Sequence, residues 1–227
     1  MNLDSMIKSK NLNALRIVAS VLGALVGFAG IEHGLFEVLQ GNTIPSGFFI
    51  EAIGPDQRFW QSGTERAVTI IPNFFITGIL AMILGFIVMI WALKYIDRKN
   101  GALILLLLSI LLFLVGGGFA PIFMAILAVL AATRIRKPLT WWQEHLPINL
   151  RNFLAAIFPL NMIIFVLMFF ISVEIAIFGY PLVAILGEIA TESFLWNFSY
   201  IMTLLMVGTI FTGIAYDIKV MNMLEGE

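Results

Sequence analysis

Residues 102–133 read ALILLLLSILLFLVGGGFAPIFMAILAVLAAT, and this uncharged stretch decides the fold. A helix needs about 20 apolar residues to span the hydrocarbon core of a bilayer. These 32 residues are therefore too many for one ordinary span and only just enough for two short ones. The centre of the stretch holds three glycines and a proline, which interrupt helices. The sequence predicts a hairpin of two short helices that turns at Gly116-Pro121.

The whole chain has the composition of an integral membrane protein. Of its 227 residues, 60% are hydrophobic and 12% are charged, whereas soluble domains are about 45–50% apolar and about 25% charged. The mean hydropathy is +1.00. This composition excludes a water-soluble domain and a disordered chain, and a net charge of -1 without an extended basic stretch excludes a nucleic-acid partner. We expect a single transmembrane domain over 1–227, surrounded by the lipid bilayer.

The remaining apolar runs complete an all-α bundle of six transmembrane helices. Each run is long enough to cross a bilayer as a helix. Two long connections, 41–67 and 134–150, carry aromatic residues, which favours an interfacial position for both. The six spans are expected at 14–38, 68–93, 99–116, 119–135, 153–178 and 190–216.

The distribution of Lys and Arg decides between five spans and six. Cytoplasmic flanks of membrane helices carry an excess of these residues. Six spans place eleven of them on one side and two, Arg58 and Arg66, on the other, whereas a single crossing of 102–133 gives six against seven. We therefore expect six spans with both termini cytoplasmic. The eleven inner cations are Lys8, Lys10, Arg16, Lys94, Arg98, Lys99, Arg134, Arg136, Lys137, Arg151 and Lys219.

Ionisable side chains within the first span are the strongest functional signal. Such a group is costly in a bilayer unless it faces protein or water. Glu32, His33 and Glu37 lie near the outer end of this span, and His33 and Glu37 share one helical face because they are four residues apart. Imidazole and carboxylate groups together suit zinc, manganese or iron. A neutral structural His33 and a solvated Glu37 are the alternatives.

Three further carboxylates are expected at a similar depth on the last two spans. Counting along the helices places Glu174 at the outer end of the fifth span, and Glu188 and Glu192 at or just beyond the outer end of the sixth. We interpret these three and the group in the first span as candidate ligand- or ion-binding residues. Glu32, His33 and Glu174 are the candidate metal ligands. Solvation of Glu188 and Glu192, and a protonated, hydrogen-bonded Glu174, are the alternatives.

A row of glycines marks one face of the first span. Gly23, Gly27, Gly30 and Gly34 follow a small-xxx-small spacing, which lets another helix backbone approach closely. We expect this face to pack against a neighbouring helix, and it is also the candidate contact face of a homo-oligomer.

No catalytic motif accompanies these residues. The chain lacks Cys, which excludes disulfides and thiolate metal sites, and it shows no nucleotide, flavin or haem signal. The favoured function is a transporter or channel for a cation or proton-coupled solute, using the outer Glu/His cluster. One alternative is a membrane-embedded metal-dependent enzyme that acts on a lipid-soluble substrate. The other is a non-catalytic structural or assembly subunit of a membrane complex.

Overall fold

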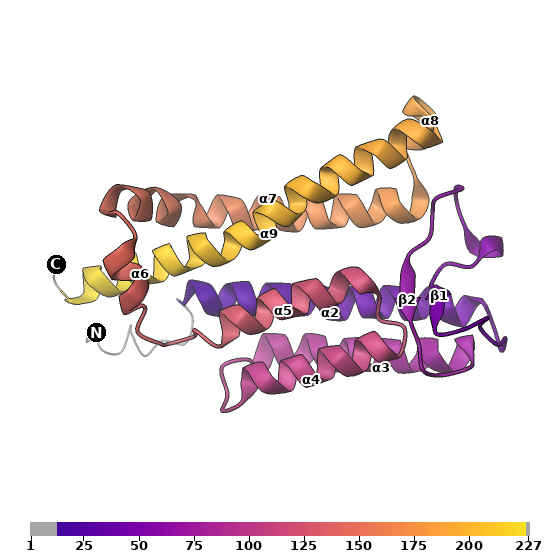
Figure 1. Ribbon diagram of the computed structural model, residues 1–227, viewed down its shortest axis with the longest axis horizontal. Helices are drawn as coiled ribbons and strands as arrows, with labels where there is room; N and C mark the ends of the chain where they lie inside the picture. The colour runs from indigo at the N-terminus through magenta and orange to yellow at the C-terminus, as the bar shows by residue number, and fades with distance from the viewer. Residues whose placement is uncertain (1–12, 226–227) are drawn as a thin grey trace.

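The computed structural model describes residues 13–225 and consists mainly of α-helices (Figure 1). Between the first two long helices lies an antiparallel sheet of β1 (Phe49–Glu51) and β2 (Arg66–Val68), with a 3-10 helix at Pro55–Gln57. The helices are α2 (Ala14–Leu39), α3 (Phe74–Lys94), α4 (Gly101–Leu114), α5 (Phe119–Ala132), α6 (Thr140–His145), α7 (Ile148–Phe178), α8 (Leu182–Leu186) and α9 (Glu188–Glu225). Lys8 and Lys10, two of the expected inner cations, lie outside the described residues.

Four helices, α2, α3, α7 and α9, are long and apolar enough to cross a membrane. The helices α4 and α5 have 14 residues each, which makes them about 21 Å long, against about 30 Å of hydrocarbon. The helical class is thus confirmed, and the four long apolar helices indicate a membrane protein. The count of six spans stays a prediction.

The long helices run side by side and alternate in direction along the longest axis (Figure 1). The start of α2, the end of α9 and the short helix α6 share one end of the molecule, which we call the α6 end. The sheet and α8 lie at the opposite end, which we call the strand end. The central helix is α2, which contacts α3, α5 and α9.

The start of α3 differs from the expected span of 68–93. Residues 66–68 pair with β1 as a strand, and the helix begins only at Phe74, where the Asn73 side chain accepts a hydrogen bond from the Ile76 amide at 3.0 Å. An asparagine in this position satisfies an amide that the helix itself leaves free. The apolar residues before Asn73 therefore belong to the connection and not to the helix.

The predicted hairpin is present as α4 and α5, but its turn is shorter than Gly116-Pro121. It comprises residues 115–118, in which Gly116 and Gly118 have positive φ angles of 100° and 82°. Only glycine adopts such angles without strain. Pro121 lies within the first turn of α5, where a helix amide has no internal partner, so its missing N–H does not break the helix.

The glycine face of α2 packs inside the chain. A Cβ atom added to Gly34 would lie 2.5 Å from the Gly78 carbonyl oxygen of α3, and one added to Gly23 would lie 2.5 Å from Ala92 Cβ, also on α3. A Cβ atom on Gly30 would lie 2.7 Å from Leu112 of α4. The close approach predicted by the spacing is therefore made by α3 and α4, which occupy the face proposed for a homo-oligomer.

Candidate functional site

The connection between α2 and α3 folds back over the end of α2 and places Glu65 beside that helix. Ala52 donates its backbone amide to the Glu65 carbonyl at 2.8 Å, directly beyond the register of the sheet. Thr64 Oγ1 donates to the Ile53 carbonyl at 2.8 Å, and Gln40 Nε2, just past α2, donates to the Ala52 carbonyl at 2.8 Å. These hydrogen bonds fix the backbone of Glu65 in place.

The same connection is joined to the α4–α5 turn. The Gly116 amide donates to the Val68 carbonyl at 2.8 Å, and the Ile70 amide donates to the Leu114 carbonyl at 2.9 Å. Thr77 Oγ1 of α3 donates to the Val115 carbonyl at 2.8 Å. The sheet, the turn and the last part of α2 therefore form one unit at the strand end.

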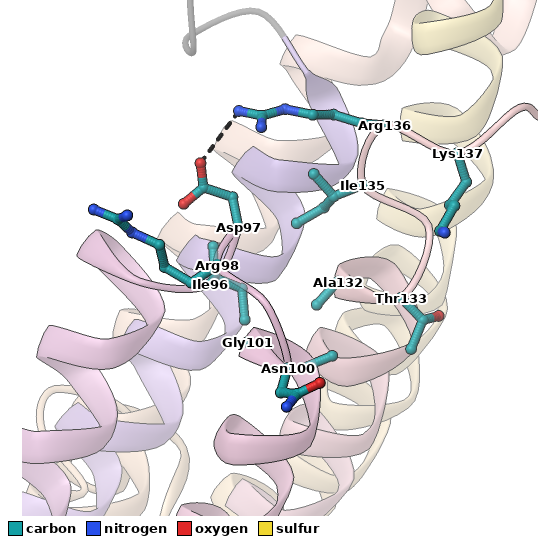
Figure 2. A pocket seen from close by; sticks show the side chains of 11 residues that line it. Ile96, Asp97, Arg98, Asn100, Gly101, Ala132, Thr133, Ile135, Arg136 and Lys137 are labelled. Carbon is teal, nitrogen blue, oxygen red and sulfur yellow. Dashed lines mark hydrogen bonds and ion pairs between the residues drawn. The ribbon is translucent and has the colours of Figure 1, made fainter.

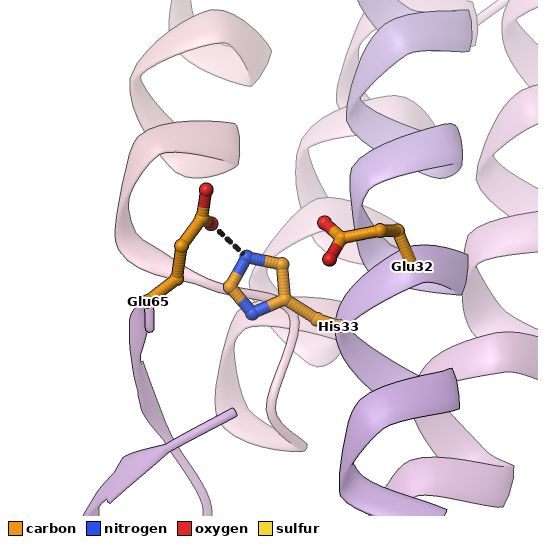
Figure 3. A group of neighbouring side chains, drawn as sticks. All are labelled: Glu32, His33 and Glu65. Atoms are coloured by element: carbon orange, nitrogen blue, oxygen red, sulfur yellow. Dashed lines mark hydrogen bonds and ion pairs between the residues drawn. The ribbon is translucent and has the colours of Figure 1, made fainter. Parts of the chain in front are cut away.

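Glu32, His33 and Glu65 converge within this unit (Figure 3). One ligand atom from each residue lies within 4.8 Å of the others. His33 Nε2 and Glu65 Oε2 are 2.5 Å apart, and the His33 side chain is 1% exposed whereas that of Glu65 is 30% exposed. The imidazole is thus buried at the centre of the cluster, whereas the two carboxylates, Glu32 and Glu65, are partly exposed.

The charge of Glu65 is stabilised by His33. Burial favours the neutral form of this carboxyl group, but the nearby charge of His33 and its hydrogen bond have the larger combined effect and lower the pKa of Glu65. The Glu65 carboxyl group is therefore held in its ionised form. Within residues 13–225, His33 Nδ1 has no hydrogen-bond partner, so the imidazole also has an unused ligand atom.

Glu37 lies four residues from His33 on α2 and is fully buried. Within the described chain, neither of its carboxylate oxygens has a hydrogen-bond partner. A Cβ atom added to Gly116 would overlap this carboxylate, and one added to Gly118 would lie 2.5 Å from His33 Nε2. The α4–α5 turn thus covers both side chains, and the alternative of a solvated Glu37 is wrong.

The other three candidate residues lie outside the cluster. Glu174 is exposed on α7 and is not among its described members. Glu188 accepts a hydrogen bond from the Gln61 amide at 3.4 Å, and Glu192 accepts one from Ser62 Oγ at 3.2 Å. These two glutamates attach α9 to the connection between α2 and α3, and Glu65 takes the position that the sequence suggested for Glu174.

The three side chains of the cluster are of types that could hold a divalent cation. An imidazole nitrogen and two carboxylate oxygens are ligands of zinc, and they also suit manganese and iron. Three protein ligands leave a coordination position for water or for a bound molecule. Comparisons of the chain with protein-family models, with curated proteins and with solved structures find no match.

Proposed function

We propose that this protein is a small polytopic membrane transporter or channel for a cation or proton-coupled solute, with Glu32, His33 and Glu65 as its cation-binding site. The observation that carries the proposal is the convergence of these three ligating side chains inside an apolar helical protein. Ionisable groups at such a depth are energetically costly and therefore rare, and those that occur usually have a function. A divalent cation of the zinc type is the ligand that this mixture of imidazole and carboxylate suits best.

The position of Glu65 favours exchange of the ion over permanent binding. Glu32 and His33 belong to the buried central helix, whereas Glu65 comes from the connection, immediately before β2. Rotation of the Glu65 side chain separates its carboxylate from His33 without breaking a helix or the hydrogen bonds of the connection. The site thereby opens toward the strand end, where the partly exposed Glu65 already meets solvent.

The proposed topology has six crossings, both termini in the cytoplasm and the strand end outside. Nine of the expected inner cations lie in the described part of the chain, and all nine belong to segments at the α6 end. Arg58 and Arg66 belong to the connection at the strand end. This asymmetry agrees with the excess of Lys and Arg on cytoplasmic flanks.

The short α4–α5 hairpin fits a crossing because the connection covers its tip. Irregular backbone is tolerated at membrane depth only where protein or water satisfies its polar groups. The hydrogen bonds from Gly116 to Val68 and from Ile70 to Leu114 do this, and Ile53 and Ala67 of the connection are buried. The connection thus extends the protein beyond the tip of the hairpin, whose two helices alone are shorter than the hydrocarbon core.

The excess of acidic residues in the segments assigned to the outer side supports cation entry. The segments assigned to the outer side carry eight Asp and Glu residues against Arg58 and Arg66, and Arg58 is paired with Glu51. A concentration of negative charge raises the local concentration of cations. The eight acidic residues are Glu32, Glu37, Glu51, Asp56, Glu65, Glu174, Glu188 and Glu192.

The proposal is tested by zinc titration of the purified protein and by zinc flux into proteoliposomes that contain a zinc-sensitive dye. We expect one bound zinc per chain and measurable flux. His33→Gln and Glu65→Gln remove a ligand each and should abolish both signals. Glu174→Gln is the matched control, because Glu174 is exposed and outside the cluster; it should leave both signals unchanged.

The outcomes separate the proposal from its two alternatives. Tight zinc binding without flux favours the metal-dependent enzyme, since three protein ligands with an open position are also the arrangement of catalytic zinc. If the protein shows no zinc binding and no flux, the transporter and the enzyme are both overturned, and a structural or assembly subunit is left. Equal loss of binding in Glu174→Gln contradicts the assignment of Glu65.

A further inference from the structure

A pocket of about 280 Å³ (Figure 2) opens at the α6 end, opposite the strand end that holds the cation site (Figure 1). Its walls are the turn between α3 and α4 and the connection that leaves α5. The polar side chains that line it are Asp97, Arg98, Asn100, Thr133, Arg136 and Lys137. We call this cavity the basic pocket.

The basic pocket has an excess of positive charge. Asp97 is the one acidic residue in its lining, and it accepts a hydrogen bond from Arg136 Nη2 at 3.2 Å. Arg16 Nε lies 3.9 Å from the same carboxylate oxygen. Asp97 is therefore already matched by two guanidinium groups. Within residues 13–225, Arg98 and Lys137 have no ion-pair partner.

The two uncommitted cations stand on opposite sides of the pocket (Figure 2). Arg136 extends across the upper part to Asp97, while the Arg98 guanidinium points outward. Both Arg98 and Lys137 are exposed, so neither side chain is held by packing and each is free to turn toward an anion in the pocket. A bidentate guanidinium and an ammonium are the usual protein partners of a phosphate group.

A helix N-terminus adds to this positive field. The helix α4 begins beside the pocket at Gly101, and its N-cap residue Asn100 makes no side-chain cap hydrogen bond. Amides in the first turn of a helix have no internal partner, and they attract anions. Ala102, in this first turn, also lines the pocket.

The backbone is strained at two positions in the same lining. Asn100 and Arg136 have φ angles of 62° and 55°, and they are the non-glycine residues with positive φ in the described part of the chain. This conformation is unfavourable for residues with a side chain, less so for Asn100 than for Arg136. Strain of this kind gathers at binding sites, where the surrounding structure maintains it.

We propose that the basic pocket binds the phosphate of an anionic phospholipid headgroup. The pocket lies at the ends of α3, α4 and α5, which the proposed topology places at the level of the inner headgroups. Basic pockets between helices on the cytoplasmic side are suited to such lipids. The exposed Trp141 of the nearby α6 is a residue type that membrane interfaces favour. The inference rests on the proposed topology but not on the cation site.

The test is a binding titration of the full chain in detergent with short-chain phosphatidylglycerol, followed by its intrinsic tryptophan fluorescence. Parallel titrations use short-chain phosphatidylcholine and inorganic phosphate. We expect saturable binding of phosphatidylglycerol and at least tenfold weaker binding of both other probes. The double variant Arg98→Gln/Lys137→Gln should weaken phosphatidylglycerol binding at least tenfold.

A matched control separates the pocket from general surface charge. Lys99→Gln/Arg134→Gln removes the same charge from adjacent positions that do not line the pocket. This variant should change the affinity less than twofold. Equal weakening by both double variants, or equal binding of inorganic phosphate and phosphatidylglycerol, overturns the proposal. An unchanged circular dichroism spectrum and an unchanged midpoint of thermal denaturation show that each variant is folded.

Discussion

At the residue scale, the site depends on two glycines of the α4–α5 turn that lie against it and have no side chain. Gly116 and Gly118 have no side chain, and this leaves room for the Glu37 carboxylate and the His33 ring. The sequence identified both glycines as breakers of a helix. It did not reveal that they cover the candidate site, because the sequence around residue 117 does not indicate which residues of α2 the turn contacts.

We predict that Gly118→Ala weakens zinc binding by about 10–100-fold, the range found when the support of a metal ligand is disturbed. The added methyl group would lie 2.5 Å from His33 Nε2 and would force the ring away from Glu65. Zinc titration measures the effect. Gly47→Ala is the control, because its Cβ atom would meet open space; a similar loss in both variants would contradict this account.

We predict that Glu37→Gln stabilises the folded protein. A buried polar group without a partner costs about 1–3 kcal/mol, and a charged one costs more, so a neutral amide of similar shape reduces that cost. Thermal denaturation in detergent should show a higher midpoint for the variant. A lower midpoint would mean that the Glu37 carboxylate is itself satisfied in the folded state, by a bound ion or water.

Glu65 shows where sequence reasoning about the site was incomplete. The residue lies in a connection without helical periodicity, so its depth cannot be counted along a helix as the depth of Glu174 was. Only the path of the connection, set by hydrogen bonds such as that from Ala52 to the Glu65 carbonyl, brings it to His33. Glu32 and His33 were identifiable because an ionisable pair inside an apolar helix is rare.

At the element scale, helix boundaries followed the sequence wherever a capping residue or a breaker marked them. The first span was expected at 14–38 and is Ala14–Leu39, with Asn13 accepting a hydrogen bond from the Arg16 amide. The expected start of the second span, residue 68, is wrong because an apolar strand and an apolar helix look alike over a few residues. Residues 66–68 form a strand because they pair with β1, a contact between residues distant in sequence.

The packing of α9 on α2 gives a prediction at this scale. Asp217 of α9 is buried, and its two carboxylate oxygens accept hydrogen bonds from the amides of Ala14 at 2.6 Å and Leu15 at 3.1 Å. It thus acts as a cap supplied by another helix, and caps contribute about 0.5–2 kcal/mol. Asp217→Ala should lower stability to chemical denaturation by about 2 kcal/mol.

Asp217→Asn is the graded control for this cap. The amide keeps one acceptor oxygen of the original two, so its loss of stability should lie between those of the native protein and Asp217→Ala. If both variants are as stable as the native protein, the contact between α9 and the start of α2 does not contribute to stability.

At the scale of the whole molecule, the arrangement of helices supports a membrane protein whose crossings can be counted by labelling. The chain has no cysteine, so single cysteines are labelled without background. Ser46 at the strand end and Pro138 at the α6 end are both exposed. Ser46→Cys should react with an impermeant maleimide in intact cells, and Pro138→Cys only after permeabilisation.

Pro138 is the decisive position in that experiment. Five crossings place it outside, because the stretch 102–133 would then cross once, whereas six crossings return it to the cytoplasm. Reaction of Pro138→Cys in intact cells would contradict the six-span topology, because it would place the connection after α5 outside the cell.

The central claim, a cation held by Glu32, His33 and Glu65, is tested most directly by X-ray absorption at the zinc edge. The chain has only two histidines, His33 and His145, and His145 is on α6 at the opposite end. We predict nitrogen and oxygen ligands at about 2.0–2.2 Å, with the signature of one imidazole that persists in His145→Gln, whereas His33→Gln should retain no zinc. Bound zinc whose imidazole signature persists in His33→Gln would contradict the account.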